Sequence, residues 1–114
     1  IKSKDMDRIV ETDIEFHELL YQASRNTRLI GIIANLREQL TRFRTLSMSY
    51  PGRLEATLEE HRDMVEAIAK GDVKAARKAA ERHMEHSEQT LLKAMDAMEH
   101  QRESNKRKKN QEES

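Results

Sequence analysis

Four ionisable residues have the types and the spacing of a metal site. Asp13 and His17 are four residues apart, which makes their side chains neighbours on one face of a helix. His61 and His83 follow further along the chain. Neutral imidazoles and one carboxylate suit zinc, nickel, manganese or iron better than calcium or magnesium. The sequence therefore predicts a divalent transition-metal site, with zinc as first candidate, made by Asp13, His17, His61 and His83.

The segments that must position these residues have the apolar periodicity of amphipathic helices. Four helices are predicted, at residues 5–24, 28–49, 54–70 and from 73 to beyond 98. At about 100° per residue, Asp13 lies about 20° and His17 about 60° from the centre of the first apolar stripe. His61 falls near the centre of the third stripe, and His83 lies about 65° from the centre of the fourth. Three helices thus direct ionisable side chains toward a shared interior.

Turn signals and apolar stripes together predict an all-α fold, an antiparallel helical bundle with four main helices. Asn26 is expected to end the first helix, Pro51-Gly52 to form a turn, and Gly71 and Asp72 to stand at C′ and N-cap positions. The stripes expected to form the core are Met6, Ile9, Phe16 and Leu20; Leu29, Ile32, Ile33, Leu36, Leu40 and Phe43; Leu54, Leu58, Val65 and Ile68; and Val73, Ala76, Ala80, Met84, Leu91 and Met98.

The same residues have a simpler interpretation, because a single interior histidine is most often a hydrogen-bonded core residue. Against it, an ionised carboxylate buried without compensation costs several kcal/mol, and four such residues converge here. His86 and His100 project more than about 120° away from the fourth stripe, so both are expected to face solvent. Ser47 points along the second stripe and Arg44 borders it at about 60°, and both are candidates to bind a carboxylate ligand beside the metal. A surface position for Arg44 is the alternative.

Composition limits the classes of partner. The 114 residues carry 21 Lys plus Arg and 21 Asp plus Glu, so there is no global field to attract nucleic acid or an acidic membrane. There is no cysteine, which excludes thiolate ligands, and no apolar run approaches the length of a membrane span. A cytoplasmic location is expected. Residues 101–114 contain no apolar side chain and are expected to form a polar, basic tail.

Two groups of short motifs resemble the FCD domain of GntR-type transcription regulators, in the FadR subfamily. The first is D-x-x-F-H followed by a leucine, A-S-x-N and a further leucine, formed by Asp13, Phe16, His17, Leu20, Ala23, Ser24, Asn26 and Leu29. The second is E-H-R, then A-I, G-D, A and H, formed by Glu60, His61, Arg62, Ala67, Ile68, Gly71, Asp72, Ala76 and His83. The resemblance covers about residues 5 to 90.

The resemblance implies a metabolite-sensing domain, here residues 1–100, that holds a divalent metal through the same Asp and three His and binds a small organic acid beside it. It also implies a homodimer and a DNA-reading domain that precedes this one. No trace of that domain or of the first helices of the bundle is visible, so operator DNA is expected to be contacted only through the missing part.

Two other functions stay open at this stage. One is a structural or interaction bundle with a stabilising metal or none. The other is a metal-dependent hydrolase, although no H-E-x-x-H and no E-x-x-H pair is present and no general base is apparent. The sequence therefore favours a sensor over an enzyme.

Overall fold

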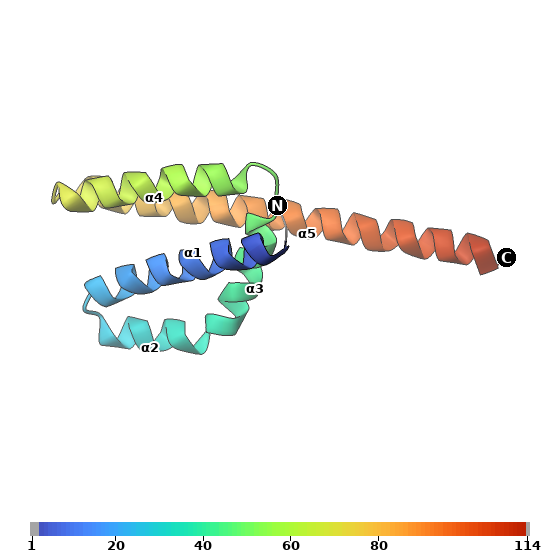
Figure 1. Cartoon of the computed structure of the whole chain (residues 1–114), viewed down its shortest axis with the longest axis horizontal. Coiled ribbons are helices and arrows are strands. Elements are labelled where there is room, and N and C mark those ends of the chain that lie inside the picture. The colour runs from blue at the N-terminus through green and yellow to red at the C-terminus, as the bar shows by residue number, and fades with distance from the viewer. Residues whose placement is uncertain (1–2, 114) are drawn as a thin grey trace. The chain divides into compact units, whose positions relative to one another are not determined.

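The computed structural model describes residues 3–113, all of whose regular structure is helical (Figure 1). The helices are α1 (Ser3–Ala23), α2 (Thr27–Asn35), α3 (Arg37–Met48), α4 (Arg53–Ala69) and α5 (Val73–Glu113). The predicted all-α class is confirmed. The helices form two compact units, α1–α3 up to Ser49 and α4–α5 from Tyr50 onward. No helix in the described part combines the length and the apolar character needed to cross a membrane.

In the first unit, α1 packs against α2 and α3 (Figure 1). The turn after α1 differs from the prediction, because the left-handed residue is Arg25, with φ of 56°, and not Asn26. Asn26 instead caps α2, since its Oδ1 accepts a hydrogen bond from the Leu29 N–H at 3.0 Å. A short polar side chain satisfies a free N–H at a helix start better than it stabilises the preceding helix end.

The single helix predicted over 28–49 is interrupted at Leu36. Its φ of −98° and ψ of 3° leave the helical range, and its N–H bonds to the Ile33 carbonyl at 3.0 Å in a tighter turn. No Gly or Pro marks this position, so no local signal predicted it. The expected core stripe is also wrong in part, because four of its members are 40–52% exposed: Leu29, Ile32, Leu36 and Phe43. The buried residues of α3 are Ser47 and Met48.

The second unit is an α4–α5 hairpin whose connection follows the sequence signals closely. Gly71 has φ of 69°, its N–H bonds to the Ile68 carbonyl, and the Asp72 N–H bonds to the Ala67 carbonyl, both at 3.0 Å. This Schellman arrangement satisfies the last carbonyls of α4. Asp72 Oδ1 then accepts the Ala75 N–H at 3.0 Å and starts α5. The predicted C′ glycine and N-cap are therefore confirmed.

The hairpin interface, however, is not made by the predicted apolar stripes. The buried residues are Arg53, Thr57, Glu60, Met64 and Ala67 on α4, with His83 and Ala94 on α5. The expected core residues Leu58, Val65, Ile68, Val73 and Met84 are between 49% and 76% exposed. Small side chains let two helix backbones approach, and charged groups that pair with one another tolerate burial. The large apolar side chains consequently lie to one side of the contact.

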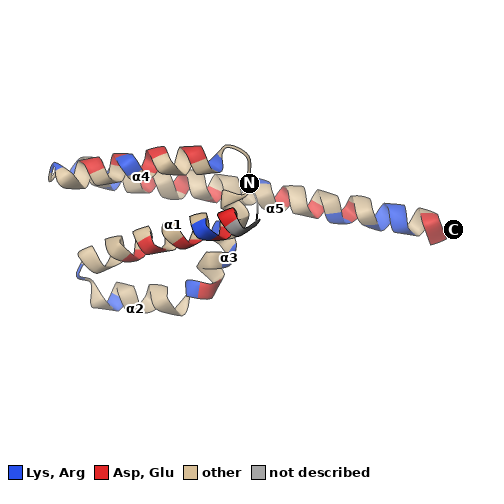
Figure 2. Cartoon of the chain, viewed as in Figure 1, with Lys and Arg blue, Asp and Glu red and all other residues tan. Residues whose placement is uncertain are grey.

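After Ala94, every described residue of α5 is exposed, yet the helix continues to Glu113. Figure 2 shows charges of both signs along this part, with the basic run Lys106–Lys109 near its end. The predicted polar tail is therefore helical over 101–113. Residues 1–2 of the predicted sensor domain and Ser114 of the predicted tail lie outside the described residues.

Two glycines allow the hairpin turn to be tested. Gly71→Ala is expected to lower the free energy of unfolding by about 1 kcal/mol, because an L-residue with a side chain is disfavoured at positive φ. Gly31→Ala, inside α2, is expected to raise it by up to about 1 kcal/mol. A Cβ at either position meets no heavy atom within 4 Å, so only backbone preference differs. Urea denaturation measures both free energies of unfolding. Changes of the same sign in the two variants would contradict the left-handed conformation of Gly71.

Candidate functional site

Helix α1 of the first unit carries the first two predicted ligands on its buried face. Asp13 and His17 are 7% and 8% exposed, and His17 Nε2 lies 3.6 Å from Asp13 Oδ1. The four-residue spacing therefore makes them neighbours, as the sequence predicted. Their burial is also as predicted, although Val10 is the buried apolar residue of α1 rather than any member of the expected stripe. A carboxylate and an imidazole side by side form one half of a possible metal site.

Arg44 on α3 faces this pair. Its Nε lies 3.6 Å from Asp13 Oδ2, and its Nη2 donates a hydrogen bond to Tyr21 Oη at 3.0 Å. The Arg44 side chain is only 19% exposed, so it is not the surface arginine of the alternative interpretation. Ser47, one turn later, is buried. The guanidinium thus connects the Asp13 carboxylate on α1 to the phenol of Tyr21.

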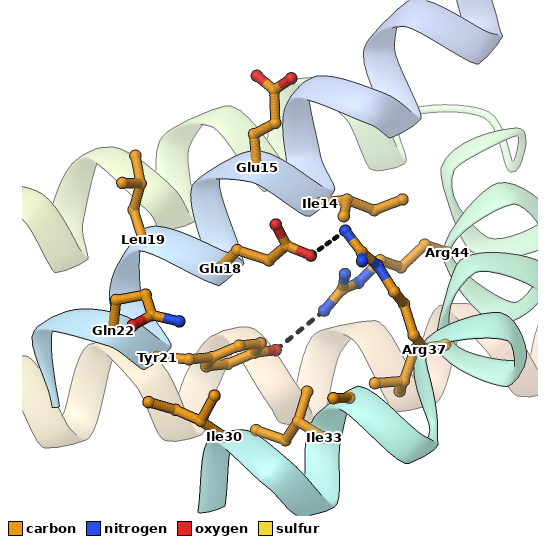
Figure 3. Close-up of a pocket in the computed structure, with 12 residues that line it drawn as sticks. Ile14, Glu15, Glu18, Leu19, Tyr21, Gln22, Ile30, Ile33, Arg37 and Arg44 are labelled. Carbon is orange, nitrogen blue, oxygen red and sulfur yellow. Dashed lines mark hydrogen bonds and ion pairs between the residues drawn. The ribbon is translucent and has the colours of Figure 1, made fainter. Parts of the chain in front are cut away.

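Arg44 also lines a cleft of about 610 Å³ inside the first unit (Figure 3). Glu18 and Arg37 form an ion pair across it. Figure 3 shows both arginines reaching toward α1 over a floor that includes Ile30 and Ile33. The full lining is Ile14, Glu15, Glu18, Leu19, Tyr21, Gln22, Ile30, Ile33, Ala34, Arg37, Leu40 and Arg44. A mostly apolar cleft with a few convergent polar groups has the character of a small-molecule site.

In the second unit, the other two predicted ligands lie next to each other. The rings of His61 on α4 and His83 on α5 have centroids 4.8 Å apart and meet edge to face at 66°. His83 is buried, at 5% exposed, although the sequence placed it at the edge of its stripe. Each histidine comes from one arm of the hairpin, so the turn at Gly71 and Asp72 determines their approach.

Glu60, immediately before His61, is the centre of a buried polar cluster in the hairpin. Its Oε1 lies 2.6 Å from Arg53 Nη2 and 2.7 Å from His83 Nδ1. Its Oε2 lies 3.0 Å from both Arg53 Nη1 and His86 Nδ1. Burial by itself raises the pKa of this carboxyl group, but the hydrogen bonds from Arg53, His83 and His86 outweigh it and hold the pKa below its ordinary value of 4.5. Glu60 is therefore an ionised acceptor at neutral pH.

The two remaining histidines behave differently from each other. His100 is exposed and its Nδ1 contacts the Asp96 carbonyl of its own helix at 2.8 Å, so its predicted solvent-facing position is confirmed. His86 is also exposed, with 45% of its side chain accessible, but its ring reaches back to Glu60. The predicted exposure of His86 is therefore confirmed, whereas its ring contacts Glu60 and does not point away from the hairpin.

Sequence reasoning did not assign roles to Arg53, Glu60 or Ser87. Arg53 donates from Nη2 to Ser87 Oγ at 2.9 Å in addition to its two bonds to Glu60. The available signal was spacing: Arg53 and Glu60 are two helical turns apart, and His83 and Ser87 are one turn apart. Imidazoles whose other nitrogen is held by a carboxylate are the usual donors to transition metals, and the chemistry of the donor set suits such an ion.

Comparison with known proteins gives a consistent assignment. Residues 1–86 match the model of the FCD domain family. The chain is 29% identical over 91 residues to the HTH-type transcriptional repressor RspR of Escherichia coli K12, and likewise to the uncharacterized HTH-type transcriptional regulator YdfH of Shigella flexneri. The match covers 80% of this chain and 40% of each relative, so the chain spans less than half of their length. No solved structure matches it significantly.

Proposed function

The chain belongs to the FCD domain family, and on that premise we propose that it binds an effector for a transcription regulator and holds a divalent transition metal through Asp13, His17, His61 and His83. One observation carries the proposal: each unit contains a neighbouring pair of these residues. Asp13 and His17 adjoin on α1, and His61 and His83 adjoin across the hairpin. Convergence of the two pairs on a single ion is part of the proposal.

Each residue then has a defined part. His61 and His83 contribute one imidazole nitrogen from each arm of the hairpin, so binding links α4 to α5. Asp13 contributes a carboxylate oxygen and lowers the net charge of the site, while Arg44 restrains its other oxygen. A zinc, nickel, manganese or iron ion bound there supplies a Lewis-acid position for a carboxylate oxygen of the effector.

A small organic acid is the proposed effector, and Arg44 its proposed contact, with Ser47 beside it. The cleft of the first unit has space for a small metabolite, and the Arg44 guanidinium lies between that cleft and Asp13. Guanidinium groups bind carboxylates with two parallel hydrogen bonds, which gives both affinity and orientation. An acid bound at Arg44 would thus act on the metal-binding aspartate directly.

The regulatory output is proposed to be a change in operator affinity in a dimeric, cytoplasmic protein that carries a DNA-reading domain. The relatives are named HTH-type regulators, which supports this assignment. Coupling between an effector site and a DNA-reading surface is usually about 1–3 kcal/mol, a 5- to 150-fold change in affinity. The family and its named relatives favour a regulator over a metal-dependent hydrolase.

The proposal is tested by metal content together with an acid-dependent thermal shift. Elemental analysis of untagged protein is expected to give about one transition-metal ion per chain, since four such ligands bind tightly. Small di- and tricarboxylic acids are then expected to raise Tm of the metal-loaded protein and not of the chelator-treated protein. Arg44→Met should abolish this shift, whereas Arg42→Met, at an exposed position on the same helix, should keep it. Absence of metal after incubation with zinc, nickel and manganese would reject the proposal.

A further inference from the structure

The His83 imidazole lies against two groups that constrain which of its nitrogens carries a proton. Its Nδ1 is 2.7 Å from Glu60 Oε1 and 3.4 Å from Arg53 Nη2. The guanidinium only donates hydrogen bonds, and an ionised carboxylate only accepts them. A bare Nδ1 lone pair at 2.7 Å from a carboxylate oxygen would be repelled, whereas an Nδ1–H makes a short charge-assisted hydrogen bond. The shorter contact therefore decides in favour of a proton on Nδ1.

The carboxylate itself is fixed from behind. Arg53 is 5% exposed. It donates from Nη1 to Oε2 and from Nη2 to Oε1, so the guanidinium binds both oxygens of the carboxylate. Ser87 Oγ, one turn after His83, accepts a further bond from Nη2 at 2.9 Å. His86 occupies Oε2 at 3.0 Å, which leaves Oε1 to His83. Arg53 and His86 thus bind the carboxylate and Ser87 binds the guanidinium, so that Oε1 is held opposite His83.

We propose that Glu60, anchored by Arg53, is a positioning residue that holds the neutral His83 ring with its proton on Nδ1 and its lone pair on Nε2. The contacts that hold the Nδ1 proton come from Glu60 and Arg53 of the hairpin, so the tautomer does not require a metal. Its use, the presentation of Nε2 to a divalent ion beside His61, rests on the proposed function. A carboxylate behind a ligating histidine fixes ring orientation and increases the basicity of the ligating nitrogen.

The decisive measurement is the tautomer of His83 in metal-free protein. Two-bond ¹H–¹⁵N spectra of protein labelled at histidine, recorded at pH 8 with chelator present, distinguish a protonated Nδ1 from a protonated Nε2. We expect the neutral form with Nδ1–H. A neutral ring with Nε2–H, or a ring protonated on both nitrogens, would overturn the proposal. This result is obtained on the wild-type protein, so it does not depend on any variant folding.

A variant pair then tests the role of Glu60. Glu60→Gln replaces one oxygen by an amide that can donate to Nδ1, so the Nε2–H form of His83 should become substantially populated. The same variant should bind zinc about 10- to 100-fold more weakly. Glu59→Gln, at an exposed neighbouring position, should change neither quantity. An unchanged tautomer in Glu60→Gln would also reject the positioning role.

The two proposals fail in different ways. Nδ1–H on His83 without stoichiometric metal binding would retain the positioning role of Glu60 and reject the metal site. Stoichiometric metal with Nε2–H on His83 in the metal-free protein would retain the metal site and reject the role of Glu60.

Discussion

Replacing Arg53 with Met is expected to lower the free energy of unfolding of the hairpin by about 3 kcal/mol. The substitution keeps an unbranched apolar stem but leaves the Glu60 carboxylate buried without its guanidinium partner. Breaking a buried ion pair by removing one partner usually costs about 3–5 kcal/mol. The lower end of this range is expected because His83 and His86 still contact the two oxygens of the Glu60 carboxylate.

Urea denaturation of the metal-free protein followed by circular dichroism measures this effect. Lys70→Met is the matched control, because the Lys70–Glu66 pair has a similar contact of 2.9 Å but both of its side chains are more than 60% exposed. An exposed pair is screened by water, so no measurable shift of the denaturation midpoint is expected for this control. Equal shifts in the two variants would show that the buried network does not stabilise the hairpin.

The difference between wild type and Arg53→Met should depend on pH in a specific direction. In the folded protein the pKa of Glu60 is lowered, mainly because the bonds from Arg53, His83 and His86 exceed the opposing effect of burial. A lowered carboxyl pKa contributes stability that is complete above the unfolded-state value, near 4.5, and is lost as pH falls through the folded-state value. The difference in free energy of unfolding between wild type and Arg53→Met should therefore narrow as pH falls below 4.5.

The double substitution His61→Ala, His83→Ala is expected to produce the largest change in metal binding, a loss of more than about 100-fold in affinity. It removes both imidazoles that the hairpin brings to 4.8 Å centroid separation, and leaves only the α1 pair. Zinc titration against a competing chelator measures the affinity. Acid should release the metal from the wild-type protein as well, because protons compete for imidazole nitrogen.

His100→Ala is the proper control for that experiment. His100 is exposed and contacts only the Asp96 carbonyl among the described side-chain hydrogen bonds, so its removal should leave metal affinity unchanged. His86 is a poorer control than its exposure suggests, because its ring shares the Glu60 carboxylate with His83. Equal losses in His100→Ala and in the double variant would show that binding is non-specific.

The sequence predicted features that depend on local chemistry. Gly71 and Asp72 were assigned correctly because positive φ and a free N–H at a helix start are satisfied by few residue types. Asp13 and His17 were placed inside because the apolar positions of α1 surround them. The Leu36 interruption was missed since no Gly, Pro or capping residue accompanies it.

The hairpin interface was missed for a different reason. Apolar periodicity identifies the most hydrophobic face of a helix, which on α4 is that of Leu58 and Val65. The buried face of α4 is a different one, which carries Ala67 and the Glu60 carboxylate paired with Arg53. The spacing of Arg53 and Glu60 within α4 allows them to pair, but neither helix alone indicates that His83 and Ser87 of α5 join them. The Glu60 cluster therefore required the structure.

The C-terminal part of α5, residues 95 to 113, has a consequence for how the chain opens. From residue 95 to 113 every residue is exposed, and Gln101 bonds to Asn105 of the same helix at 3.1 Å. This stretch contains no buried residue, so its amide hydrogens should exchange rapidly and residue by residue. Amides near His83 can exchange only when the whole hairpin opens. One uninterrupted helix thus has two regimes of hydrogen exchange. Its two halves are continuous in structure but do not unfold as one cooperative unit.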